Sequence, residues 1–128
     1  LVFMHTVDFD TKSETAFPYS RGDPTLGPRV ATCTVRYEDG TTADIPMHYG
    51  WNVGDFRLDG TKSDELFSRY LADCREIIVN EADTEVRYVY EWANPHQEKR
   101  IAGVSIARDK GCPPVYRLFA VSAICPKR

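Results

Sequence analysis

The chain has 128 residues, which is enough for one domain with a two-layer core. Hydrophobic residues make up 42% and aromatic residues 12%, the composition of an ordinary globular domain. The formal net charge of −3 argues against binding to nucleic acid, which requires a basic surface. No stretch approaches the roughly 20 apolar residues of a membrane span, so no membrane partner is predicted.

Residues 1–7 are mostly apolar and predict a strand. The chain opens directly in this strand, without a signal peptide, so we expect residues 1–128 to be a single domain excised from a larger protein. Residues 8–28 are rich in Ser, Thr, Gly, Pro and Asp and predict a long loop. Asp8 and Asp10 have a spacing that suits a structural calcium ion, but such an ion needs six or more oxygens. The sequence therefore predicts no cofactor.

A β-hairpin is the clearest local signal. Residues 29–38 alternate between apolar and polar side chains, as a strand with one wet face does. Asp39-Gly40 then supplies the residues of a tight turn before a second strand at 41–47. Pro46 lacks an N–H group, so the second strand ends there or lies at a sheet edge. The face predicted to be buried comprises Ala31, Cys33, Val35 and Tyr37.

The rest of the chain also favours strands. Residues 48–60 form an aromatic and glycine-rich loop, and an apolar stripe within 62–74 predicts one short helix. Four further strands are expected, at 76–79, 85–92, 99–108 and 115–123. The Asn94-Pro95 corner, followed by a short connection, predicts that 85–92 and 99–108 form an antiparallel pair. The pattern predicts an all-β, jelly-roll β-sandwich.

The four cysteines show no C-x-x-C spacing, so a zinc site is not predicted. Cys33 lies within a strand and is interpreted as a small buried hydrophobe. Cys112 and Cys125 flank the last strand, and the sequence leaves open whether they form a disulfide.

Short motifs also follow one another in a distinctive order. They are LVFMHT at 1–6, VRYEDGT at 35–41, IP at 45–46, YGWNVGDF at 49–56, YEWANPH at 90–96 and KRI at 99–101. This series resembles the galactose-binding-like β-sandwich domains attached to bacterial secreted glycoside hydrolases. The resemblance implies a jelly roll, an accessory role beside a catalytic domain, and a secreted or periplasmic location. It departs from that family because the strands that usually precede the LVFMHT strand are missing and the 62–74 insert has no counterpart.

A catalytic role is not predicted. The sequence contains histidines, serines and carboxylates but no G-x-S-x-G motif or comparable context for a nucleophile. His5 alternates with apolar neighbours and is interpreted as an interior histidine. Asp55 and Glu91 are the best pair for glycoside hydrolysis, but a carboxylate beside a glycine-rich turn often accepts backbone N–H bonds instead.

Two loops offer the chemistry of a sugar site, which needs a flat aromatic ring beside planar polar groups. The predicted carbohydrate-binding residues are His48, Tyr49, Trp51, Asn52, Asp55, Asn94 and His96. Both tryptophans have a second interpretation as core residues, which is favoured for Trp92. The first functional hypothesis is therefore a non-catalytic carbohydrate-binding module whose partners are a glycan and a neighbouring catalytic domain. The alternative is a structural interaction domain without a ligand of its own.

Overall fold

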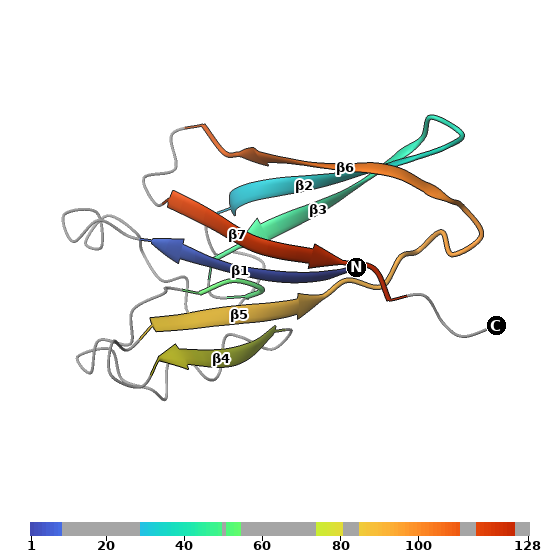
Figure 1. Ribbon diagram of the computed structural model, residues 1–128. Helices are drawn as coiled ribbons and strands as arrows, with labels where there is room; N and C mark the ends of the chain where they lie inside the picture. Colours follow the sequence, from blue (N-terminus) through green and yellow to red (C-terminus); the bar gives the residue numbers. More distant parts are fainter. Residues whose placement is uncertain (9–28, 50, 55–73, 81–84, 111–114, 125–128) are drawn as a thin grey trace.

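The computed structural model describes residues 1–8, 29–49, 51–54, 74–80, 85–110 and 115–124. This part of the chain forms two antiparallel β-sheets and contains no helix (Figure 1). An all-β fold is therefore confirmed. The predicted helix falls on 62–74, which lies outside the described residues except for Cys74, the first residue of a strand. The strands are β1 (Val2–Asp8), β2 (Arg29–Tyr37), β3 (Thr42–His48), β4 (Cys74–Asn80), β5 (Glu85–Glu91), β6 (Ile101–Arg108) and β7 (Val115–Ser122).

The two sheets differ in size and are offset from each other. The larger has the strand order β4-β5-β1-β7, and the smaller has the order β3-β2-β6. Across the sandwich, β7 lies against β2, the middle strand of the smaller sheet. As a result, the edge strand β6 lies beyond β7, the last strand of the larger sheet. Figure 1 shows β6 above β7, at the top of the view. This offset decides which inward-facing side chains are covered.

The core lies between β1, β2, β3 and β5. Alternate residues of β2 are buried, as the predicted two-residue period requires, and Cys33 is a buried free cysteine. Burial raises the pKa of the Cys33 thiol to about 11, so this thiol stays protonated. Tyr88 and Tyr90 of β5 face inward, and Trp92 packs against the core while remaining partly exposed. The core comprises Phe3, Val7, Val30, Ala31, Cys33, Val35, Tyr37, Ile45, Met47, Tyr49, Val53 and Tyr90.

The predicted hairpin is confirmed. Gly40 has a φ of 84°, and its N–H donates to the Tyr37 carbonyl at 3.0 Å. The Asp39 carboxylate accepts from the Thr41 N–H at 3.0 Å and also pairs with Lys99. These contacts with Lys99 and Thr41 hold the pKa of Asp39 below its usual value. β3 forms one edge of its sheet, as Pro46 predicted, because proline cannot donate to a further strand.

The predicted pairing of 85–92 with 99–108 is wrong. β5 pairs with β1 and β4, whereas β6 pairs with β2 in the other sheet. The start of the chain occupies the place expected for β6, since Trp92 and Leu1 exchange backbone bonds of 2.8 and 2.9 Å. A proline corner and a short connection fit an arch between two sheets as well as a hairpin within one. Glu91 is exposed, as expected.

Gly40→Ala should lower the free energy of unfolding by about 1–2 kcal/mol, because a Cβ is disfavoured at positive φ. Nothing crowds this position, so the effect would come from the backbone alone. Chemical denaturation measures it. Gly103→Ala in β6 is the matched control, since that position has no positive φ and its nearest neighbour lies 3.4 Å from an added Cβ. Equal costs at both positions would contradict this account of the turn.

Candidate functional site

The loop after β3 is built around the side chain of Asn52. This residue is fully buried. Its Oδ1 accepts the His48 backbone N–H at 2.8 Å, and its Nδ2 donates to the Pro46 carbonyl at 2.9 Å. Both atoms of the amide are therefore used to hold the loop. The structure places this predicted sugar contact inside the protein, where it stabilises a turn.

The same loop is joined to the larger sheet by His5, which is fully buried in the centre of β1. Its Nε2 lies 2.7 Å from the Asn52 carbonyl, and its Nδ1 lies 2.7 Å from the Tyr116 hydroxyl. A carbonyl only accepts, so Nε2 carries the proton and the Tyr116 hydroxyl donates to Nδ1. Burial lowers the pKa of His5 to about 4, opposed by its bond to Asn52. The interpretation of His5 as an interior histidine is confirmed.

Two predicted sugar contacts of this loop remain partly exposed. The His48 and Trp51 rings lie 6.0 Å apart and are tilted by 54°. Tyr49, in contrast, is buried in the core, and Asp55 lies outside the described residues. The surface of the loop thus offers one indole face and one imidazole.

The second predicted sugar loop, 92–100, is also stabilised by an asparagine. The Asn94 Oδ1 accepts the Tyr37 hydroxyl at 2.6 Å and the His96 N–H at 2.9 Å, while Nδ2 donates to the His96 carbonyl. The His96 ring meets the Tyr37 ring edge-on at 5.6 Å and lies 3.6 Å from Glu98. Asn94 therefore fixes the arch between the sheets, and the rings of this loop that are partly available to a ligand are those of Trp92 and His96.

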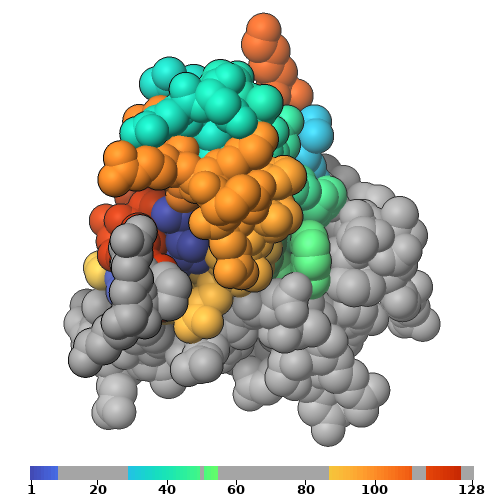
Figure 2. Space-filling model, turned by 90° about the vertical axis from the view of Figure 1, so that its right-hand side faces the viewer, coloured from blue at the N-terminus to red at the C-terminus, as the bar shows by residue number. Residues whose placement is uncertain are grey.

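The two predicted sugar loops lie at opposite ends of the sandwich. The 92–100 arch lies beside the β2–β3 turn, where the Glu38 N–H donates to the Arg100 carbonyl (Figure 2). β3 leads away from that turn and reaches His48 at its far end. The candidates therefore do not form one site. Each loop keeps one partly exposed tryptophan, Trp51 or Trp92, and one partly exposed histidine, His48 or His96.

A third surface, which the sequence analysis did not single out, lies along β6 and β7. In the β2–β6 ladder, Val35 faces Val104 and Tyr37 faces Ile101, so these β6 side chains point toward the other sheet. Leu118 of β7 is opposite the inward-facing His5. Yet Ile101, Val104 and Leu118 are 37%, 40% and 40% exposed. We call Ile101, Val104 and Leu118 the open apolar side.

The sequence contains one feature that could have indicated the open apolar side. Residues 101–107 contain no charged side chain, although they form a strand. Such a run is typical of a strand buried on both faces or paired on both edges. Periodicity shows which residues share a face but not whether a second layer covers them, so the missing cover was not predictable.

Metal and membrane chemistry receive no support from the described residues. Among them, no group of three or more His, Cys, Asp or Glu side chains is arranged to hold a metal ion. The Asp8 carboxylate forms an ion pair with Arg117, and Asp10 lies outside the described part. Cys112 and Cys125 lie outside it too. No helix long and apolar enough to cross a membrane occurs in the same ranges.

Comparisons with known proteins give no relative: no protein-family model, curated protein or solved structure matches the chain. Of the three surfaces, the open apolar side presents exposed apolar side chains from two edge strands.

Acidification should reveal the buried histidine. His5 binds a proton near pH 6.5 when unfolded but only near pH 4 when folded, so stability is present above pH 6.5 and is lost as the pH falls toward 4. Between pH 7 and pH 5, the free energy of unfolding should drop by about 2 kcal/mol. Urea denaturation at the two pH values measures this drop.

His5→Gln is the control, because glutamine does not titrate. Its stability should change much less over the same interval, even if it is lower at both pH values. A drop of the same size in His5→Gln would show that another group carries the pH dependence.

Proposed function

We propose that the chain is a non-catalytic β-sandwich interaction domain that associates with a neighbouring domain or subunit through the open apolar side. The observation that carries this proposal is the exposure of inward-facing side chains on two edge strands, Ile101 and Val104 of β6 and Leu118 of β7. The connectivity of a galactose-binding-like jelly roll and a secreted or periplasmic location belong to the same proposal. The ordered motifs support both, whereas the two antiparallel sheets support only the β-sandwich architecture.

Burial of these residues would be favourable. Each square ångström of apolar surface removed from water is worth roughly 25 cal/mol, and a side chain that already points into the sandwich loses little further freedom on being covered. Val115 and Phe119 are also exposed, at 48% and 41%, but they lie on the outer face of β7, because Val115 is opposite Asp8 and the Phe119 ring lies 4.0 Å from the Arg87 guanidinium. Contiguous exposed apolar residues are a common sign of a protein–protein contact. The first hypothesis, glycan binding, rests on four partly exposed rings that are divided between the two ends of the sandwich: His48, Trp51, Trp92 and His96.

Site-directed photocrosslinking in the cells that produce the protein tests the interaction. A photoreactive phenylalanine analogue at Val104 or Leu118 should give an adduct of one defined mass. The same analogue at Thr42, an exposed residue on the opposite edge of the smaller sheet, should give none. Absence of an adduct at both Val104 and Leu118, or an equal adduct at Thr42, would contradict the proposal.

Glycan binding is the second candidate, favoured by the partly exposed Trp51 beside His48. An indole face stacks on the C–H groups of a sugar ring. If the loop binds glycan, Trp51→Ala should weaken binding by at least about tenfold without changing the melting temperature, as measured by isothermal titration calorimetry. Replacement of His96 with Ala, at the other end of the sandwich, should leave the affinity unchanged. No binding to any polysaccharide in a broad panel would exclude this candidate.

A further inference from the structure

We propose that uptake of a second proton by His5 separates the edge strand β7 from the sandwich while the other strands stay folded. The contact that senses the proton is the hydrogen bond between His5 and Tyr116 of β7. Leu118 of the open apolar side lies on the same strand, so acid would also disrupt that surface.

The two nitrogens of the His5 ring respond differently to acid. Nε2 already carries a proton, which it donates to the Asn52 carbonyl at 2.7 Å, and a second proton leaves this bond intact. The second proton binds at Nδ1, to which the Tyr116 hydroxyl donates at 2.7 Å in the neutral state. Two donors then face each other across that bond. Protonation therefore acts on the β7 side of the ring and not on the 51–54 side.

No described group that faces the His5 ring is an acid that could neutralise an imidazolium. These groups are a carbonyl, three phenols and a thiol: Asn52, Tyr88, Tyr90, Tyr116 and Cys33. Burial, and to a lesser extent the nearby Cys33 thiol, raises the pKa of Tyr116, so the phenol stays protonated. Burial lowers the pKa of His5 to about 4. A charged ring is stabilised here only if water reaches it.

β7 is weakly attached to the sandwich. It pairs with one strand, β1, and six of its eight residues are exposed. Its two partly buried residues, Tyr116 and Val121, are the ones that pack against the core. Arg117 pairs with Asp8 at the surface, where an ion pair contributes little.

The 51–54 segment on the other side of the His5 ring is held by further bonds. The Val7 N–H and the Thr6 hydroxyl both donate to the Gly54 carbonyl, at 2.9 and 3.3 Å. These bonds do not depend on the charge of the ring. Opening at β7 is therefore the less costly way for water to reach His5.

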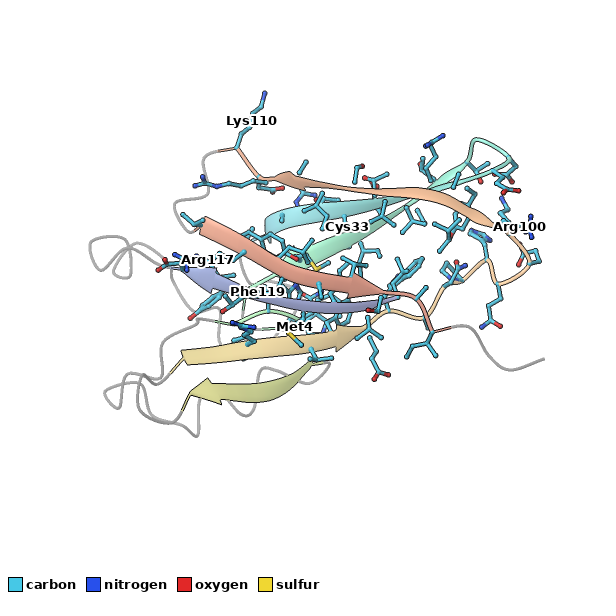
Figure 3. All side chains as sticks on the ribbon, in the orientation of Figure 1. Met4, Cys33, Arg100, Lys110, Arg117 and Phe119 are labelled. Carbon is cyan, nitrogen blue, oxygen red and sulfur yellow. The ribbon has the colours of Figure 1, made fainter. Side chains whose placement is uncertain are left out.

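The thiol of Cys33 can report whether β7 has moved. Cys33 is fully buried on β2, the strand against which β7 lies, and Figure 3 shows its sulfur between the two sheets. A dithiodipyridine reagent modifies thiols in acid as well as at neutral pH. Peptide mass spectrometry distinguishes Cys33 from the other three cysteines. The rate of a small free thiol at each pH corrects for the reactivity of the reagent.

Labelling of the 128-residue chain should become faster in acid. His5 binds a proton near pH 6.5 once it is open to water but only near pH 4 in the closed sandwich, so the open state is favoured as the pH falls. From pH 7 to pH 5, the corrected labelling rate of Cys33 should rise at least about tenfold. Separation of one strand exposes little surface, so low concentrations of urea should hardly change this rate at pH 5. Hydrogen exchange of the β7 amides should show the same weak dependence on urea.

Substitutions test the two partners of the bond. In His5→Gln, the corrected labelling rate should not depend on pH. Tyr116→Phe removes the hydroxyl and should raise the rate at pH 7 by about threefold or more. Tyr37→Phe is the matched control, because it also removes a buried hydroxyl that binds a side chain, but at the other end of the sandwich, and it should leave the rate unchanged. Circular dichroism establishes that each variant folds, and the urea dependence in the unaltered chain needs no variant.

Four results would reject the release of β7. The first is a corrected labelling rate that is equal at pH 7 and pH 5. The second is a rate at pH 5 that rises with the full urea slope of global unfolding, since the whole domain would then have to unfold. The third is loss of amide protection at 51–54 while β7 stays protected. The fourth is a pH dependence of the same size in His5→Gln.

Discussion

The buried imidazole of His5 is the contact on which the arrangement of the two sheets depends. It lies on β1, the strand that joins β5 to β7, and it bonds to both the 51–54 loop and Tyr116. The same loop is fastened a second time, because the Val7 N–H donates to the Gly54 carbonyl at 2.9 Å. A Cβ at Gly54 would overlap the Tyr88 ring, so only glycine permits this approach. These bonds hold residues 51–54, which follow β3 of the smaller sheet, against β1 in the middle of the larger sheet.

The two hydrogen bonds of the His5 ring require a neutral imidazole. The carbonyl of Asn52 and the hydroxyl of Tyr116 satisfy both ring nitrogens of one tautomer, and a second ring proton would displace the hydroxyl as donor. Burial also raises the pKa of Tyr116, so its hydroxyl remains available to donate. A charged ring here would lack a counter-ion among these partners. The network is consistent with a structural role, in which every polar atom is satisfied internally.

The two asparagines show how an amide that is predicted to bind sugar can hold a turn instead. A planar amide that can bind the hydroxyls of a sugar can equally bind the N–H and carbonyl groups of a turn. Asn52 and Asn94 do the latter, each within a few residues of its own position. The sequence shows that a loop contains an amide, but not whether the amide faces inward. Here nearby backbone N–H and carbonyl groups bind both side-chain amides.

Much of the fold was predictable, because strand alternation and turn chemistry are local. The hairpin at Gly40, the edge position of β3 and the inward series Tyr88 and Tyr90 are all confirmed. The separation of β5 and β6 into different sheets was not predictable, since it depends on which distant segment pairs with β5. Leu1 and β1 take that place, almost ninety residues earlier in the chain. Pairing partners at that distance leave no mark in the local pattern.

At the edge of the core, the pair Val35 and Val104 shows the same limit of prediction from local sequence. Val35 and Val104 are direct partners in the β2–β6 ladder, so they are the same residue type on the same face of the same sheet. Val35 is fully buried, whereas Val104 is 40% exposed. Their chemistry is identical, but β2 is the middle strand of its sheet and has β7 opposite it, whereas β6 is an edge strand. Burial therefore depends on the strands beside a residue and on the layer opposite it, neither of which the local sequence pattern contains.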